Sequence, residues 1–150
     1  YPRARDNAAV ALRPNELDYF EVKAGVSAEA WKDATVAVTA FYSPEYTAKQ
    51  GAVWTFEGAF TQVLPKLRDI TPTFSALVGY QIADDVTKYF TAAGKDNYVY
   101  WNAGLTLGFH DRFSIDLRYW DTNISNTAGF CTAPVFQCDA RFVATAKITY

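Results

Sequence analysis

The sequence predicts an all-β protein, an antiparallel up-and-down transmembrane β-barrel, on three observations. Half of the 150 residues are hydrophobic, yet the mean hydropathy is only −0.11. No apolar run approaches the ~18 residues that a membrane-spanning helix requires. Apolar and polar residues instead alternate with a period of two, which places them on opposite faces of strands. Along the chain, the connections between these segments are alternately short and long.

Seven segments carry this alternation. In the clearest of them, residues 140–150, Phe142, Ile148 and Tyr150 share one face while Arg141 and Lys147 lie on the other. The predicted strands are 17–27, 34–42, 51–61, 71–82, 97–109, 113–120 and 140–150. Their length of about ten residues exceeds the ~5–6 of soluble sheets and suits a tilted strand crossing a bilayer. Residues 1–16 are expected to form a loop, and the whole chain a single barrel domain.

The charged residues well inside these segments all lie on the polar faces. They are Glu21, Lys23, Glu57, Asp116, Arg118, Arg141 and Lys147. In a membrane barrel this face lines the lumen, where the seven charges sum to +1. Two interpretations stay open: the charges pair and plug a narrow barrel, or they line a water-filled passage and bias its selectivity. Glycines on the same face leave room or relieve curvature: Gly25, Gly79, Gly104 and Gly108.

The connections favour a bilayer over water as the surroundings of this sheet. Residues 28–33, 64–70 and 110–112 form the short set, and residues 43–50, 83–96 and 121–139 form the long set. Short turns at one end and long loops at the other are typical of outer-membrane barrels. We therefore expect a bacterial outer-membrane protein, with the C-terminus and short turns in the periplasm and the long loops outside the cell.

Aromatic residues gather near the expected strand ends, as in the girdles that lie at lipid headgroup level. The groups are Tyr19/Phe20, Phe41/Tyr42, Tyr98/Tyr100/Trp101, Tyr119/Trp120 and Tyr150. The alternating C-terminal strand with Phe142, Ile148 and the final Tyr150 also looks like the signal that outer-membrane assembly machinery reads.

Other side chains that could carry chemistry lie in expected loops. Cys131 and Cys138 are predicted to form a disulfide, because they are an even pair in a loop and the outer-membrane environment is oxidising. Two free thiols or half a metal site are the alternative. His110 is interpreted as a turn residue, and Asp84, Asp85 and Asp111 as loop carboxylates. No enzyme activity is expected.

Composition excludes further classes of function. The net charge of −2 argues against nucleic-acid binding, for which a basic excess is expected. Two cysteines and one histidine leave no room for a Cys/His zinc cluster. We expect no cofactor and no metal. The expected partners are outer-membrane lipid, the barrel-assembly machinery and small solutes, and assembly with further copies or a membrane partner protein stays open.

Several strings resemble the TorF-type porin family of proteobacteria. They are Tyr42–Tyr46, Trp54–Gly58, Val63–Pro65, Tyr100–Phe109, Asp111–Asn123 and Cys138–Thr145. The resemblance covers most of the chain from about Leu17 and implies an outer-membrane β-barrel with porin activity. Family members have further strands before this region. Together with seven strands, no Met and no secretion signal, this predicts the C-terminal part of a larger, even-stranded barrel.

Three functions are compatible with these patterns. The leading one is an outer-membrane porin that lets small solutes diffuse passively through a lumen lined by the seven charges. The second is a non-conducting structural or interaction barrel whose long loops bind a partner. The third is a soluble, lipocalin-like barrel, in which the faces are reversed and the apolar side surrounds a ligand.

Overall fold

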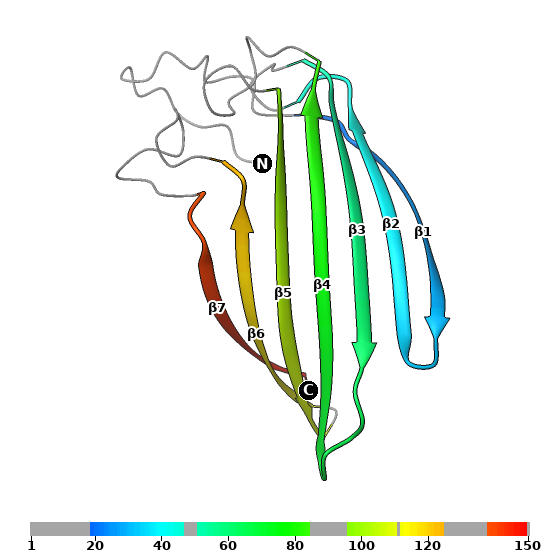
Figure 1. The fold of residues 1–150 in the computed structure, drawn as a ribbon, viewed down its shortest axis with the longest axis vertical. Coiled ribbons are helices and arrows are strands. Elements are labelled where there is room, and N and C mark those ends of the chain that lie inside the picture. Colours follow the sequence, from blue (N-terminus) through cyan, green and yellow to red (C-terminus); the bar gives the residue numbers. More distant parts are fainter. Residues whose placement is uncertain (1–18, 47–50, 85–95, 111, 125–137, 150) are drawn as a thin grey trace.

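The computed structural model describes residues 19–46, 51–84, 96–110, 112–124 and 138–149. These residues form seven antiparallel strands in one sheet, and each strand pairs with the next along the chain (Figure 1). The strands are β1 (Val22–Trp31), β2 (Ala34–Ser43), β3 (Val53–Val63), β4 (Ile70–Ala83), β5 (Asn97–Phe109), β6 (Phe113–Thr122) and β7 (Arg141–Ile148). The all-β, up-and-down prediction is confirmed. No helix in these ranges is long and apolar enough to cross a membrane.

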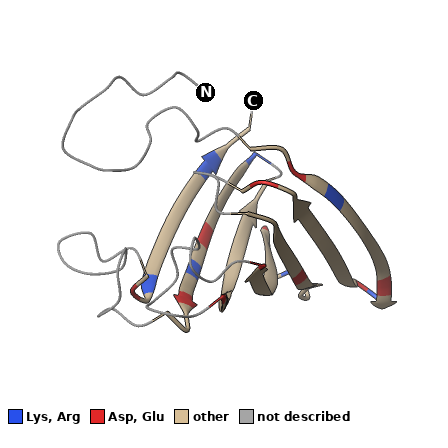
Figure 2. Cartoon of the chain, turned by 90° about the horizontal axis from the view of Figure 1, so that it is seen from above, with Lys and Arg blue, Asp and Glu red and all other residues tan. Residues whose placement is uncertain are grey.

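The sheet is strongly curved but open. Seen from above, it forms an arch with β1 and β7 at its two sides (Figure 2). The strand order ends at β1 and at β7, so these two strands are the edges of the sheet and do not pair with each other. Because β1 and β7 are separated by an even number of antiparallel steps, they run in the same direction.

The strand register gives the sheet two chemically distinct faces. Cross-strand partners point to the same side, and one row runs from Val26 through Val38, Gly58 and Val78 to Trp101. The neighbouring rows on that side are also mainly apolar, so we call it the apolar face. The opposite side, the polar face, carries most of the charged and hydroxyl side chains. For the residues within the strand ladder, the predicted assignment to two faces is confirmed.

The polar face is the concave side of the arch. Thr55, Gln81 and Asn102 on this face are 7%, 7% and 3% exposed, whereas Val38 and Val78 on the apolar face are 60% and 52% exposed. Side chains converge on the inside of a curved sheet and spread apart on the outside. The difference in exposure therefore follows from the curvature.

The connections alternate in length as predicted. Two, six and three residues join β1 to β2, β3 to β4 and β5 to β6, and β7 ends at the same end of the sheet (Figure 1). The chain between β2 and β3, β4 and β5, and β6 and β7 comprises 9, 13 and 18 residues. Long and short connections thus lie at opposite ends of the strands.

The first strand and its turn differ from the prediction. β1 begins five residues and ends four residues later than the predicted segment, and the turn is Lys32-Asp33 instead of residues 28–33. Asp33 takes a left-handed backbone (φ 64°), which permits the tight turn. The register shifts between Glu29 and Trp31, so a bulge turns Trp31 to the apolar face, opposite Ala34.

Candidate functional site

The polar face is the candidate site, because most of the predicted functional charges lie on it. Lys23, Glu57, Asp116, Arg118, Arg141 and Lys147 share this face in the strand register. Glu21 directly precedes β1 and lies outside the ladder, so no strand partner assigns it to a face. Sequence reasoning missed Glu29, which also lies on the polar face opposite Thr35, because residues 28–33 were assigned to a turn.

Arg118 on β6 is the centre of a hydrogen-bond network that spans three strands. Its guanidinium donates to both carboxylate oxygens of Asp116 at 3.0–3.1 Å, to Asn102 Oδ1 on β5 at 2.6 Å and to Ser75 Oγ on β4 at 2.7 Å. Asp116 also accepts from Thr106 Oγ1 at 2.6 Å. The side chains of Arg118 and Asp116 are 18% and 25% exposed, and their charges compensate each other.

The space for this network comes from a glycine. Gly104 on β5 lies opposite Arg118, and a Cβ built at Gly104 would lie 2.8 Å from the Leu117 carbonyl oxygen and 3.1 Å from the Arg118 Cβ. The missing side chain at Gly104 therefore leaves room for Arg118, which is one of the two roles predicted for the glycines on this face.

A second contact, between Tyr100 and Glu57, crosses from β5 to β3. The Tyr100 hydroxyl donates to Glu57 Oε1 at 2.6 Å. Between them lies Gly79 on β4, and a Cβ at Gly79 would overlap the Tyr100 ring. The ring thus lies flat against β4. Tyr100 was predicted to belong to an aromatic girdle, and that prediction is wrong, since its side chain is on the polar face.

The other predicted girdle residues divide between the faces. Phe41, Tyr98 and Trp120 share the polar face with Tyr100, and Lys23 Nζ lies 5.1 Å from the Phe41 ring centroid. Tyr42, Trp101 and Tyr119 lie on the apolar face. Neighbouring aromatic residues in a strand point to opposite sides, so pairs such as Phe41/Tyr42 cannot both face lipid.

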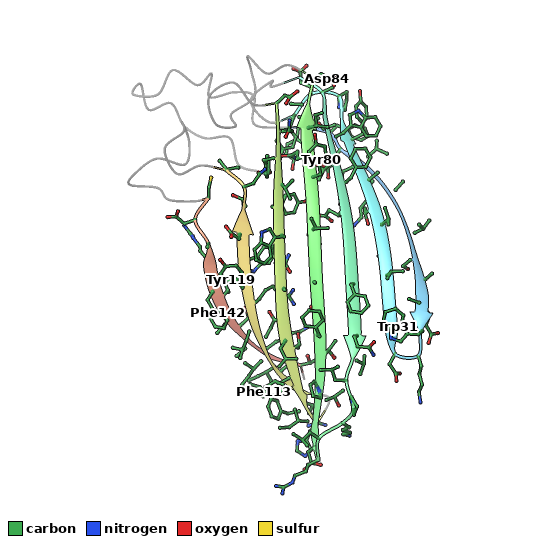
Figure 3. The ribbon with its side chains drawn as sticks, in the orientation of Figure 1. Trp31, Tyr80, Asp84, Phe113, Tyr119 and Phe142 are labelled. Carbon is green, nitrogen blue, oxygen red and sulfur yellow. The ribbon has the colours of Figure 1, made fainter. Side chains whose placement is uncertain are left out.

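The apolar face carries contacts between rings on adjacent strands and, among the described residues, has nothing packed over it. Ring centroids lie 4.4 Å apart for Tyr42 and Trp54 and 5.2 Å apart for Trp101 and Tyr119. Figure 3 shows side chains distributed along the full length of the strands. Asp121 is the charged exception on this face; it lies near the end of β6, where it accepts a hydrogen bond from the Tyr119 hydroxyl at 3.4 Å.

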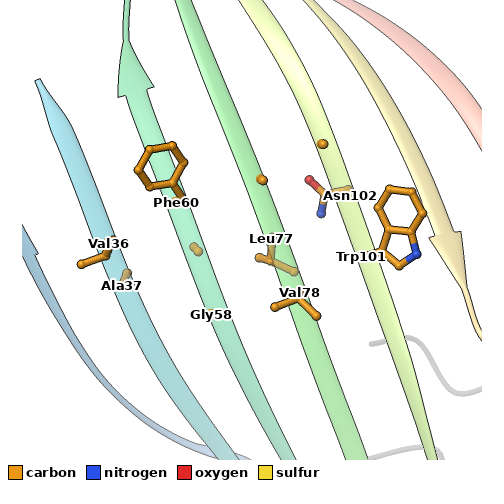
Figure 4. Close-up of a pocket in the computed structure, with 11 residues that line it drawn as sticks. Val36, Ala37, Gly58, Phe60, Leu77, Val78, Trp101 and Asn102 are labelled. Carbon is orange, nitrogen blue, oxygen red and sulfur yellow. The ribbon is translucent and has the colours of Figure 1, made fainter. Parts of the chain in front are cut away.

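A shallow hollow of about 470 Å³ crosses the middle of β2–β5 (Figure 4). On the apolar face its floor is formed by Gly58, Ala76 and Ala103, and larger side chains such as Phe60 and Trp101 border it. The hollow is open, so it is a depression in the exposed surface.

The structure describes only some of the residues for which a C-terminal assembly signal and a disulfide are predicted. Phe142 and Ile148 lie on the apolar face and are 68% and 71% exposed, while Tyr150 lies outside the described residues. Cys138 is buried and no described cysteine is free. Its predicted disulfide partner, Cys131, also lies outside the described residues, so the pairing stays a prediction.

The predicted loop residues show no assembled catalytic or metal-binding group where they are described. His110 is in the β5–β6 turn with a left-handed backbone (φ 49°) and Asp84 directly follows β4, while Asp85 and Asp111 lie outside the described residues. Within the described ranges, no three His, Cys, Asp or Glu side chains are grouped to hold a metal ion.

Comparison of the chain with protein-family profiles, with curated proteins and with solved structures finds no match. The resemblance to the TorF-type porins therefore stays a prediction.

Proposed function

We propose that this sheet is part of the wall of a bacterial outer-membrane β-barrel through which small solutes diffuse passively. The observation that carries the proposal is the chemistry of the two faces. The convex face is mainly apolar, and no described residue packs over it, while the concave face carries most of the charged and hydroxyl side chains. A bilayer requires apolar side chains toward lipid and tolerates polar ones only toward an interior.

The strand dimensions and connections support a membrane-spanning wall. Six of the seven strands have 10–14 residues, enough for a tilted strand to cross the hydrocarbon core. The short connections and the end of β7 would face the periplasm, and the long connections would lie outside the cell. Phe142 and Ile148 on the convex face of β7 fit a terminal strand that the assembly machinery recognises.

In the proposed barrel, the open edges of the sheet must be closed by further strands. A sheet can cross a bilayer only if its edge strands are paired, and β1 and β7 run in the same direction. Antiparallel pairing at both edges then requires an odd number of further strands, which gives the even total usual for bacterial outer-membrane barrels. In the proposed barrel, these strands lie outside the residues that the structure describes.

Planar-bilayer recording with folded full-length protein tests the proposal. We expect discrete conductance steps after the protein inserts. Protein that migrates as folded in unheated gels but produces no steps would contradict a pore.

A second candidate is a non-conducting barrel, which the Arg118 network favours. Its cross-strand hydrogen bonds fill part of the concave side and hold charged groups in fixed positions. In such a barrel the long connections would bind a partner. Shortening the chain between β6 and β7 would then abolish partner binding and leave membrane permeability unchanged.

The soluble, lipocalin-like alternative places the apolar face inside. In this structure the apolar face is the convex side, which argues against that arrangement. Solubility of the full-length protein without detergent would support the soluble alternative and contradict the proposed membrane barrel.

A further inference from the structure

Each of the three short connections carries a cation directly beside a carboxylate. The pairs are Lys32-Asp33 between β1 and β2, Arg68-Asp69 between β3 and β4, and Asp111-Arg112 between β5 and β6. Asp111 lies outside the described residues, and the other five are exposed. Together with Lys66, the connections hold four cations and three carboxylates, so this end of the sheet, the short-turn end, is rich in charge but nearly neutral.

Within the described part of the chain, these neighbouring charges do not pair with each other. Lys32 and Asp33 form no ion pair there, and neither do Arg68 and Asp69. The backbone of the first turn is nevertheless held, because the Asp33 carbonyl oxygen accepts from the Val63 amide at 2.8 Å. The charged groups are therefore available to bind something outside the sheet.

Large apolar side chains lie next to these charges along the chain. Trp31 precedes Lys32, Leu67 precedes Arg68, and Phe113 follows Arg112; all three apolar residues are exposed. Trp31 and Phe113 lie on the apolar face, toward the short-turn end (Figure 3). A surface that combines apolar and charged side chains in this way suits the boundary between hydrocarbon and head groups.

Trp31 and Gln62 lie at the end of the apolar face nearest the first turn. The Trp31 indole Nε1 donates to Gln62 Oε1 at 2.7 Å, and Gln62 Nε2 donates to the carbonyl oxygens of Val63 at 2.8 Å and Asp33 at 3.2 Å. The Gln62 amide is thus bonded within the protein, as a polar group at the margin of hydrocarbon must be. Lys32 and Asp33 follow Trp31 directly, so the charges begin where the apolar face ends.

We propose that the short-turn end binds the head groups of phospholipids that carry both a phosphate and a primary ammonium group. The cations of the turns donate to the phosphate, the carboxylates accept from the ammonium, and the neighbouring apolar side chains contact the first carbons of the acyl chains. This inference rests on the proposed function, because it requires the convex face to lie in a bilayer. Salt screens charges beyond about 8 Å, so lipids beside these turns respond mainly to the turns themselves.

The chemistry of the turns favours an ethanolamine head group over the two other common kinds. Because cations and carboxylates are nearly balanced, a head group with a net negative charge gains little attraction overall. A choline head group carries the same two charges as ethanolamine, but its quaternary nitrogen has no N–H and cannot donate to Asp33 or Asp69. The difference between ethanolamine and choline lipids therefore isolates the hydrogen bonds to the carboxylates.

Electron paramagnetic resonance of spin-labelled lipids tests the inference with folded full-length protein in phosphatidylcholine bilayers. The spectra resolve lipids held at the protein surface from bulk lipid. The probes are phosphatidylethanolamine, phosphatidylcholine and phosphatidylglycerol, each labelled near the end of one acyl chain. Exposed charge contacts contribute little individually, so we expect phosphatidylethanolamine to be enriched at the surface about twofold over phosphatidylcholine, and phosphatidylglycerol to be enriched less.

The carboxylates of the turns are then removed conservatively. In the double variant Asp33→Asn/Asp69→Asn we expect the enrichment to fall toward one, while the amount of phosphatidylcholine at the surface is unchanged. Asn tolerates the left-handed backbone of Asp33 (φ 64°), so the turn is kept. Glu29→Gln is the matched control for Asp33→Asn alone. It removes the same charge from the same hairpin, but from the polar face, and should leave the enrichment unchanged.

The outcomes separate the two proposals. If the protein holds lipid at its surface without enriching phosphatidylethanolamine, if the double variant keeps the enrichment, or if Glu29→Gln lowers it as much as Asp33→Asn, the inference is wrong. A stronger enrichment of phosphatidylglycerol would mean that the turns bind phosphate alone, which also contradicts it. Folded protein with no lipid held at its surface would contradict the membrane barrel itself, and this inference with it. Planar-bilayer recording decides separately whether the barrel conducts.

Discussion

The two faces of the sheet differ in the reach of their side-chain contacts. On the polar face, hydrogen bonds pass over an intervening strand, from Arg118 to Ser75 and from Tyr100 to Glu57. On the apolar face, most ring contacts join residues on the same or on adjacent strands, such as Trp101 and Tyr119. The exception among the described residues is Trp31 on β1, which reaches past β2 to Phe60 and Gln62 on β3 at the short-turn end. The concave side brings side chains together, so its residues stabilise one another. The convex side leaves them exposed, so their stability depends on what surrounds the sheet.

The largest expected effect is the cost of a charge on the convex face. Leu77 and Val78 are neighbours in the middle of β4, and they point to the polar and apolar faces. In lipid, Val78→Lys should lower the free energy of unfolding by about 3 kcal/mol, because a lysine on the lipid side must be removed from water. Leu77→Lys should cost less than half as much. Urea unfolding of full-length protein in lipid vesicles measures both.

The variants Val78→Lys and Leu77→Lys also discriminate the membrane barrel from the soluble alternative. If the apolar face surrounded a ligand in a soluble protein, Val78→Lys would abolish ligand binding and the protein would fold without lipid. Equal costs for the two variants would mean that neither face contacts hydrocarbon, which contradicts the assignment of the convex face to lipid.

The next largest effect concerns the network on the concave face. Arg118→Leu would leave Asp116 and the buried Asn102 without the donor that now satisfies them. Because hydrogen bonds with charged groups contribute about 1.5–3 kcal/mol, we expect a loss of about 2 kcal/mol in the free energy of unfolding.

Lys147→Leu is the control for this prediction, because it removes a positive charge from the same face near the end of β7, where Lys147 is exposed. Its effect should stay within about 0.5 kcal/mol, as for most surface substitutions. A loss for Arg118→Leu no larger than that of Lys147→Leu would mean that the network does not stabilise the sheet.

The two faces and most strand boundaries could be predicted because they follow from alternation along a single strand. The strand Val22–Trp31 is predicted too near the N-terminus, because the alternation of apolar and polar residues begins before the pairing between strands does. The contacts across strands could not be predicted. That Tyr100 reaches Glu57 depends on Gly79 lying between them, which only the register of three strands reveals.

A smaller effect is expected at Gly79, and it tests whether this glycine stabilises the sheet by leaving room for the Tyr100 ring. In Gly79→Ala the new methyl group overlaps the Tyr100 ring, so the ring must turn away and its bond to Glu57 is lost. We expect a loss of about 1 kcal/mol in the free energy of unfolding. Gly58→Ala on the apolar face is the control, since its Cβ would meet Val78 Cγ1 at an ordinary 3.8 Å.

A double-mutant cycle sharpens the comparison. If the cost of Gly79→Ala arises from the displaced ring, it should shrink when Tyr100 is already replaced by Ala. An unchanged cost in the Tyr100→Ala background would place the effect in the backbone of β4 instead.

The smallest expected effect lies at the short-turn end, where the bulge in β1 turns Trp31 to the apolar face. Its indole Nε1 donates to Gln62 Oε1 at 2.7 Å, and its ring centroid lies 5.7 Å from that of Phe60. Trp31→Phe keeps a ring and removes the donor. Since both partners are exposed, we expect a loss near the lower end of the usual contribution, about 0.5 kcal/mol, in urea unfolding.

Trp101→Phe provides the matched comparison on the same face. Trp101 also contacts a ring, that of Tyr119, and its indole has no hydrogen-bond acceptor among the described residues. The difference between the two variants therefore isolates the bond from Trp31 to Gln62. Equal losses would show that Trp31 contributes only through its ring. A larger loss at Trp31 would mean that even the convex face is held by a directed contact where the sheet meets its turns.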